Sequence, residues 1–144
     1  MVTDPTKQPH VLFLCIHNAG RSQMALGFFE HYAAGRAIGT SGGSEPGDQV
    51  NPVAIEVMAE RGIDISKEFP KPWTHTGLQA ADAIITMGCG DECPFYPGKR
   101  YEDWVLEDPK GKDLDTVRAI RDDIEQRVIG LLESLGLPVP ATAA

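Results

Sequence analysis

Residues 10–25 have the sequence HVLFLCIHNAGRSQMA, and the rest of the chain is interpreted around this stretch. Val11 to Leu14 form a continuous apolar run, typical of a strand buried on both faces of a parallel sheet. Gly20 interrupts the pattern, and apolar residues at helical spacing follow it. The stretch therefore predicts a strand over about 10–15, a tight loop, and a helix over about 21–35.

The loop between strand and helix carries Cys15, then five residues, then Arg21 and Ser22. Backbone N–H groups in such a loop and the positive end of the following helix favour an anion, and a guanidinium can hold two of its oxygens. The same field favours the thiolate of Cys15, the nucleophilic form. The stretch predicts a site for one tetrahedral oxyanion above the cysteine sulfur, although a buried core cysteine remains the alternative. The residues expected to wrap the anion are Ile16, His17, Asn18, Ala19, Gly20, Arg21 and Ser22.

Length and composition indicate one globular domain. The chain has 144 residues, of which 42% are hydrophobic, and a formal net charge of −8. The acidic balance disfavours nucleic acid and anionic membranes as partners, and no apolar run approaches the ~20 residues of a membrane helix. Three cysteines and a polar start without a signal-peptide pattern predict a cytoplasmic protein with thiol chemistry rather than a structural disulfide.

Strands and helices alternate along the chain. Besides the first strand and helix, the elements predicted are strands over 37–41, 83–87 and 101–106, a helix from Asn51-Pro52 to about Gly62, a helical turn over 78–81, and a helix over 113–135. Loops are expected over 42–50, 69–76 and 88–99, and the charged residues of the last helix, Arg121 and Glu125 among them, mostly on its solvated face. The domain is expected over 9–135, with flexible tails at 1–8 and 136–144.

This alternation predicts an α/β fold, a three-layer domain with parallel strands joined by right-handed crossovers. In such sheets ligands bind beyond the carboxyl ends of the strands. Cys15, the loop after Met87 and the loop after Leu106 all lie at such ends. We therefore expect these three stretches to converge on one edge of the sheet.

Asp108-Pro109 lies in the last of these stretches. Proline fixes φ and stiffens the loop, and a carboxyl group that faces the anion can protonate a departing oxygen. Asp108 is therefore the candidate general acid, with Glu107 as its nearest rival. The alternative is that Asp108 only caps a turn.

Cys89 and Cys93 lie four residues apart in the loop after Met87. At that spacing two thiols can meet at disulfide distance, across a helical turn or in a mobile loop. Two thiols without a histidine partner are not a zinc set, so no metal site is expected. That they are two unrelated loop cysteines remains an alternative.

The sequence from Cys15 to Ala25 resembles the anion loop of the low-molecular-weight protein tyrosine phosphatase superfamily, and more narrowly the arsenate reductases built on that fold. Those phosphatases usually have proline after the Arg-Ser pair, whereas this chain has Gln23, as the reductases do. The likeness runs from about residue 10 to about residue 133. It implies a four-stranded parallel sheet in the order 2-1-3-4 flanked by helices.

The resemblance also implies roles. Cys15 is the nucleophile that attacks arsenate, Arg21 binds the oxyanion, and Asp108 is the acid. Cys89 attacks the adduct, and Cys93 then resolves the pair by forming a disulfide with Cys89, which thioredoxin reduces. The spacing between Cys89 and Cys93 is shorter than that between the relay thiols of the best-known relay enzymes. A related group uses a low-molecular-weight thiol such as mycothiol with its glutaredoxin-type partner, mycoredoxin. Arsenic detoxification is the expected function, with no tightly bound cofactor.

Two positions depart from the relatives. The phosphatases tend to follow the Asp-Pro pair with tyrosine, which lines a pocket for an aryl substrate, but Lys110 and Gly111 follow here. Some relatives bind potassium through a glutamate where this chain has Leu26. These departures weaken the case for phosphotyrosine and for a potassium site.

Three other functions stay open. A phosphomonoester phosphatase needs the same Cys15, Arg21 and Asp108 but no second thiol. A phosphocarrier of a sugar-uptake system also places a cysteine after its first strand, but it has no evident need for the arginine or the acid. A thiol switch or oxyanion sensor binds the anion without turnover.

Overall fold

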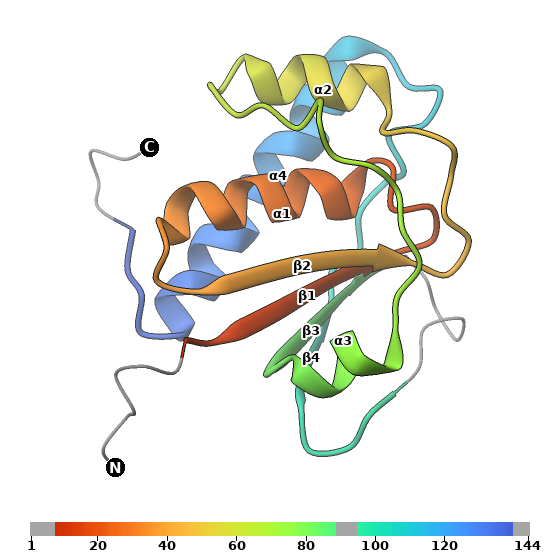
Figure 1. The fold of residues 1–144 in the computed structure, drawn as a ribbon. Coiled ribbons are helices and arrows are strands. Elements are labelled where there is room, and N and C mark those ends of the chain that lie inside the picture. The colour runs from red at the N-terminus through yellow and green to blue at the C-terminus, as the bar shows by residue number, and fades with distance from the viewer. Residues whose placement is uncertain (1–7, 89–94, 140–144) are drawn as a thin grey trace.

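Four parallel strands form a sheet in the order β2-β1-β3-β4 (Figure 1). The computed structural model describes residues 8–88 and 95–139. The strands are β1 (His10–Cys15), β2 (Ile38–Gly43), β3 (Ala83–Met87) and β4 (Arg100–Asp103). The helices are α1 (Arg21–Ala33), α2 (Pro52–Ala59), α3 (His75–Ala80) and α4 (Leu114–Ser134). The parallel sheet, its order and the three layers predicted from the sequence and its resemblance are confirmed.

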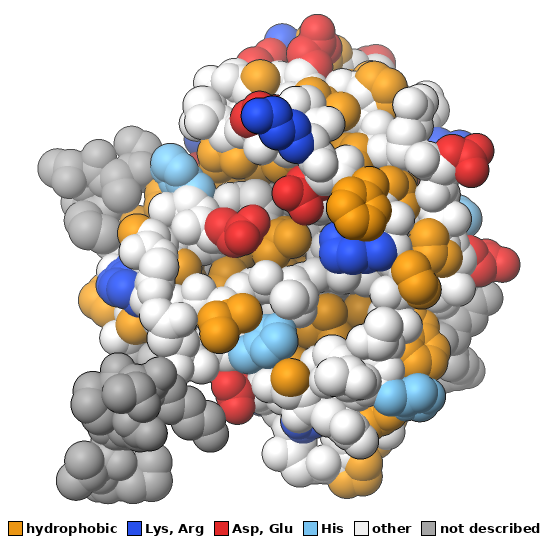
Figure 2. Space-filling view, viewed as in Figure 1, with side chains coloured by type: hydrophobic (Ala, Val, Ile, Leu, Met, Phe, Trp, Pro, Cys, Tyr) orange, Lys and Arg blue, Asp and Glu red, His pale blue; other side chains and the backbone are white. Residues whose placement is uncertain are grey.

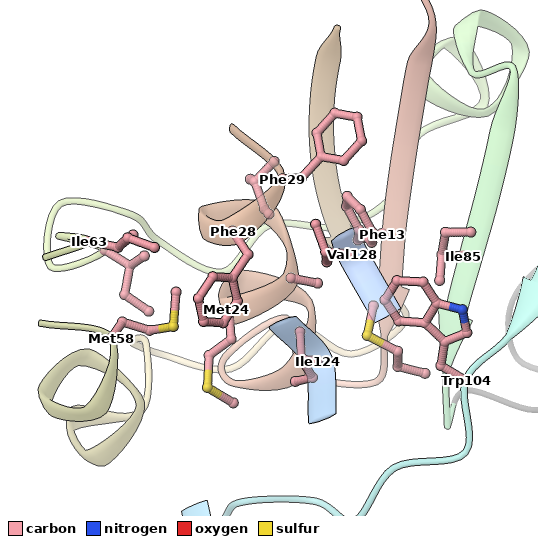
Figure 3. Packing of buried hydrophobic residues seen from close by; sticks show 14 of the residues in the cluster. Phe13, Met24, Phe28, Phe29, Met58, Ile63, Ile85, Trp104, Ile124 and Val128 are labelled. Carbon is pink, nitrogen blue, oxygen red and sulfur yellow. The ribbon is translucent and has the colours of Figure 1, made fainter. Parts of the chain in front are cut away.

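The main core lies between the sheet and the layer of α1, α2 and α4. Alternate residues of β1, Phe13 among them, face this side and are fully buried. The Phe13 ring packs edge-on against Phe29 of α1, with ring centroids 5.5 Å apart. The ring of Trp104, which directly follows β4, lies 6.0 Å from the Phe13 ring between centroids. Figure 3 shows these rings together with Ile124 and Val128 of α4. Burying each such side chain stabilises the fold by about 1.5–3 kcal/mol.

A smaller cluster covers the opposite face of the sheet. Leu12 and Leu14 of β1 pack there against Leu78 of α3, which explains why the β1 run is apolar without alternation. The Thr74 hydroxyl caps α3 by accepting a hydrogen bond from the Gly77 N–H at 2.9 Å. Because of this cap α3 begins at His75, so the turn predicted over 78–81 starts too late and the predicted loop 69–76 ends too late.

Two strand limits also differ from the predictions. β2 continues through Gly42 and Gly43, which were assigned to the loop 42–50. They pair with the end of β1, and a Cβ atom on Gly43 would lie 2.6 Å from a backbone oxygen of the anion loop, so glycine is required there. β4 ends at Asp103 rather than at 106, because the next residue, Trp104, turns its ring into the core.

The expectation that Arg121 and Glu125 lie on the solvated face of α4 is wrong. Both are buried, at 6% and 5% exposure. Arg121 donates to Glu60 at the end of α2 at 2.6 Å, and Glu125 accepts from Arg61 at 2.7 Å. Helical spacing identifies the apolar face of α4. It does not reveal that Glu60 and Arg61, at the end of α2, cover the charged residues beside that face and pair with them.

The segment that directly follows α4 packs against the rest of the domain. Leu137 and Val139 contact the main core, although they lie in the segment predicted as a flexible tail.

No helix in the described part of the chain is long and apolar enough to span a membrane. Figure 2 shows one face of the molecule, where acidic and basic side chains are interspersed rather than gathered into a block of one charge.

Candidate active site

The sulfur of Cys15 lies at the carboxyl end of β1, where the chain turns into α1. Its Sγ is 2.9 Å from the hydroxyl oxygen of Ser22 and accepts a hydrogen bond from the Asn18 N–H at 3.2 Å. The residue is 2% exposed. Two polar groups thus hold the sulfur at the floor of the loop, and both stabilise a negative charge on it when Ser22 donates. The strand and loop predicted over residues 10–20 are confirmed.

The backbone of the loop is turned so that its N–H groups point inward. The carbonyl oxygens of Ile16, His17 and Ala19 accept hydrogen bonds from backbone N–H groups of the segment 45–51, at 2.8, 3.0 and 2.7 Å. In a trans peptide the C=O and N–H bonds point in opposite directions, so the N–H groups that follow these carbonyls face the centre of the loop. This is the arrangement that an oxyanion requires.

Asn18 is the turning point of the loop. Its φ is +51°, in the left-handed region that residues other than glycine seldom adopt. Its side-chain amide donates to the Ser22 hydroxyl at 2.7 Å, and its Oδ1 accepts from the Lys71 N–H at 3.0 Å. Asn18 therefore connects the loop to the segment 69–73. Asn18 and Lys71, which form this contact, are 53 residues apart in the sequence.

The guanidinium of Arg21 is fixed at one side of the loop. Its Nη1 donates to the carbonyl oxygen of Leu106 at 3.2 Å, and its Nη2 lies 3.7 Å from the Asp108 carboxylate. Gly88 passes close to it, with φ +85°, and a Cβ atom there would lie 2.6 Å from Nη1. The loops after β3 and β4 therefore both reach the anion loop, as the sequence predicts.

The Asp108 carboxylate caps a turn and also faces the anion loop. Its Oδ1 accepts from the Lys110 N–H at 3.0 Å and so caps a turn, while Oδ2 faces Arg21. The rival Glu107 turns away and pairs with Lys112 at 3.2 Å. Of the two carboxylates, Asp108 is the one that lines the pocket above Cys15.

The pocket measures about 670 Å³ and is wider than the anion loop itself. The segments 45–52 and 108–111 form its walls, and Glu45, Asp48 and Lys110 supply charged groups. The ring of His17 is held by the Glu45 carbonyl oxygen, 2.8 Å from its Nδ1. Among the described residues that line the pocket, none is phenylalanine, tyrosine or tryptophan.

The predicted relay thiols, Cys89 and Cys93, lie outside the described residues. The described residues contain no group of three or more His, Cys, Asp and Glu side chains that could hold a metal ion. Leu26 is buried in the core. The Lys71 ammonium donates to the Ser41 hydroxyl at 3.3 Å.

Sequence reasoning missed three residues that shape the site. Gln23 was singled out only as a mark of resemblance, yet its buried amide contacts Asn18. Lys71 carried no signal, because its contact with the loop joins segments far apart in sequence. For Gly88 the sequence offered only its position. A glycine directly after a buried strand was a hint of close approach, but not of what it approaches.

The fold and the loop define a class of small α/β proteins that present a Cys-x5-Arg anion loop after the first strand. The chain belongs to the low molecular weight phosphotyrosine protein phosphatase family, whose model matches residues 10–139. It is 38% identical over 128 residues to the glutaredoxin arsenate reductase of Synechocystis sp., covering 87% of this chain and 97% of that protein.

Two solved structures are similar as well. One is a thioredoxin-dependent arsenate reductase from Corynebacterium glutamicum, with a TM-score of 0.81 and 45% identity over 92% of this chain; the match spans 64% of that longer chain. The other is an arsenate reductase in the phosphate-binding state, with a TM-score of 0.79 and 37% identity, covering 88% of this chain and 98% of that one.

Proposed function

We propose that this protein is an arsenate reductase in which Cys15 attacks the arsenic atom. The observation that carries the proposal is the environment of the Cys15 sulfur: it lies under inward-facing N–H groups, within 2.9 Å of the Ser22 hydroxyl, in a pocket that Arg21 and Asp108 border. The names of the similar proteins support arsenate as the oxyanion.

In the first step arsenate lies in the loop from Cys15 to Arg21. The Cys15 thiolate attacks arsenic(V), so that an As–S bond forms and an As–O bond breaks. The departing group is an arsenate hydroxyl, which takes the proton of Asp108 and leaves as water. The proximity of the Asp108 carboxylate to Arg21, 3.7 Å, supports this role, because a leaving oxygen held by Arg21 lies within reach of the acid.

In the second step another thiolate attacks the Cys15 sulfur. An S–S bond forms, the electron pair of the As–S bond stays with arsenic, and arsenic(III) leaves as arsenite. In the internal version of this step the thiolate is Cys89. Cys93 then attacks Cys89, which releases Cys15 and leaves a Cys89–Cys93 disulfide.

The reductant is an external thiol. Thioredoxin fits the internal version, since its dithiol reduces the Cys89–Cys93 disulfide, and one similar structure is of a thioredoxin-dependent enzyme. A small thiol such as mycothiol, with mycoredoxin, replaces the internal relay in the alternative version. The relative named as a glutaredoxin arsenate reductase keeps that alternative open. We propose that the enzyme works in the cytoplasm, where such thiol systems are reduced.

A phosphatase is the second candidate, because the matched family is named for phosphotyrosine hydrolysis and the first step is the same. The pocket argues against an aryl ester: no phenylalanine, tyrosine or tryptophan occurs among its described lining residues, and Lys110 and Gly111 follow the Asp-Pro pair. A flat aromatic ring gains little from such polar walls.

Arsenite production with two reductant systems tests the proposal. One assay contains thioredoxin, thioredoxin reductase and NADPH; the other contains mycothiol and mycoredoxin. Loss of turnover in Cys15→Ser is expected in both. Turnover with thioredoxin that Cys89→Ser and Cys93→Ser each abolish supports the internal relay, whereas turnover only with the small thiol supports thiol transfer. No arsenite in either assay, with rapid hydrolysis of an aryl phosphate, overturns the proposal in favour of the phosphatase.

The acid is tested with a matched pair of variants. Asp108→Asn is expected to slow adduct formation by about 10²–10⁴-fold while arsenate still binds. Glu107→Gln removes the neighbouring carboxylate, which pairs with Lys112 outside the pocket, and is expected to leave the step nearly unchanged. Equal rates for the two variants contradict the assignment of Asp108.

A further inference from the structure

The side chain of Gln23 is fully buried in the first turn of α1, behind the anion loop. Its amide nitrogen lies within hydrogen-bond distance of three oxygens. It donates to the backbone oxygen of Asn18 at 3.1 Å, to the side-chain Oδ1 of Asn18 at 3.2 Å, and to the Phe69 carbonyl oxygen at 3.2 Å. One side chain thus ties the anion loop to the segment 69–71.

The orientation of this amide is fixed by its neighbours. If the amide were flipped, its oxygen would face three other oxygens, none of which can donate. In the orientation observed, Gln23 Oε1 is buried and has no hydrogen-bond partner among the residues that the structure describes. A buried acceptor without a partner costs stability, so the position carries a cost that a hydrophobic side chain would avoid.

What Gln23 holds is the residue that contacts the nucleophile. Asn18 keeps φ at +51°, and from there its N–H donates to the Cys15 sulfur while its amide donates to Ser22. The Ser22 hydroxyl in turn lies 2.9 Å from the same sulfur. Both donors of Asn18 therefore act on the thiol, one directly and one through Ser22.

We propose that Gln23 is a positioning residue that sets the reactivity of Cys15 by holding Asn18 in its left-handed conformation. The Lys71 N–H, which donates to Asn18 Oδ1 at 3.0 Å, acts from the same side and anchors the segment 69–71 to the loop. The inference rests on the proposed function in one respect only, the use of Cys15 as a nucleophile. It accounts for an amide at a place where its oxygen has no hydrogen-bond partner among the described residues.

The test uses Gln23→Met in a chain that also carries Cys89→Ser and Cys93→Ser, so that Cys15 is the one remaining thiol of the three. Methionine is unbranched and of similar length, but it donates no hydrogen bond. The charged and titratable groups around the sulfur, Arg21, Asp108 and His17, stay in place. The rate of Cys15 alkylation by iodoacetamide is measured across pH, without arsenate.

We expect Gln23→Met to lower the alkylation rate at neutral pH by about tenfold and to move the pH profile upward, because the thiolate loses the donors that Asn18 orients. In the arsenate assay, which uses Gln23→Met in a chain that keeps Cys89 and Cys93, kcat should fall more than KM rises, since Arg21 still binds the anion. Gln79→Met is the matched control: it makes the same substitution on the exposed surface of α3 and is expected to change neither measurement.

A double-mutant cycle tests whether Gln23 acts through Asn18. Asn18→Gly keeps the N–H and tolerates a positive φ, but it removes the side chain that Gln23 holds. In that background Gln23→Met is expected to change the alkylation rate by less than about twofold. Full additivity of the two substitutions overturns the inference.

An unchanged alkylation profile in Gln23→Met also overturns the inference. A fall of the thermal midpoint with an unchanged profile would show that Gln23 contributes to packing and stability but not to the reactivity of Cys15. Alkylation needs no arsenate and no reductant. The inference therefore survives or fails separately from the proposed reductase activity, which only the turnover assays decide.

Discussion

The close approach of Gly88 to Arg21 leads to a prediction about anion binding. A Cβ atom at Gly88 would lie 2.6 Å from Arg21 Nη1, well inside the 3.4 Å at which ordinary contact begins. In Gly88→Ala the guanidinium must therefore move by about 0.8 Å, and a displacement of this size in a positioned group can lower catalysis by about 10²-fold. The variant is expected to lose arsenate affinity and kcat/KM to that extent.

The same substitution also strains the backbone, because φ at Gly88 is +85°. That strain costs about 1–2 kcal/mol and lowers the thermal midpoint by several degrees. Gly98→Ala separates the two effects. Gly98 has φ +87°, but no atom of residues 8–88 or 95–139 lies within 4 Å of the position of a Cβ, so this control carries the strain without the contact.

Arsenate affinity is measured as protection of Cys15 from alkylation, and stability as the midpoint of thermal unfolding. Gly88→Ala and Gly98→Ala should lose similar stability, while only Gly88→Ala loses protection by arsenate. If both variants bind arsenate as well as the unmodified protein, the close contact with Arg21 does not set the geometry of the site, and the reasoning fails.

Other predictions concern stability and the acid loop. Hydrogen bonds from two arginines of α4 lower the pKa of Glu60 from its ordinary value of 4.5 to about 2. The stabilising effect of the Glu60 carboxylate is therefore complete above about pH 4.5 and is lost as the pH falls toward 2. Urea unfolding should show Glu60→Gln less stable than the unmodified protein at pH 7 but nearly equal at pH 2, with Glu56→Gln on the same helix as an unaffected control. Burial and the hydrogen bond to Glu125 raise the pKa of Tyr32 to about 12, and Tyr32→Phe, which deletes the 2.6 Å bond, should lower the free energy of unfolding by about 1–3 kcal/mol; an unchanged urea midpoint would contradict this. In Gly20→Ala the new methyl group would lie 2.8 Å from the ring of the proline that follows the proposed acid, so adduct formation should slow; equal pre-steady-state rates would show that the loop yields freely.

Much of the fold was predictable because its signals are local. The apolar run of β1, the loop to Gly20 and the Asn51-Pro52 start of α2 each depend on neighbouring residues, and Asn51 does cap that helix by accepting from the Val53 N–H at 2.9 Å. The predicted limits of the strands were wrong where contacts with distant residues decide where a strand ends. β2 gains Gly43 by pairing with Cys15, and β4 loses three residues because Trp104 turns into the core.

The candidate site divides in the same way. Cys15, Arg21 and Asp108 follow from the spacing of reactive residues at strand ends, where the topology of a parallel sheet brings them together. The sequence favoured Asp108 over Glu107 only through the Asp-Pro pair and the resemblance, since adjacent residues on one loop differ mainly in direction. The contacts support this choice: Asp108 lines the pocket and lies beside Arg21, whereas Glu107 pairs with Lys112.

The sequence alone therefore determined the architecture and singled out the proposed nucleophile, because strand burial, helix starts and a Cys-x5-Arg loop are properties of contiguous residues. The tertiary structure decided how the nucleophile is held. Gln23, Lys71 and Gly88 approach the loop from α1, from the segment 69–73 and from the end of β3. Their contacts span up to 67 residues of chain, from Arg21 to Gly88, and hydrogen bonds and steric limits at such separations exist only once the sheet has formed.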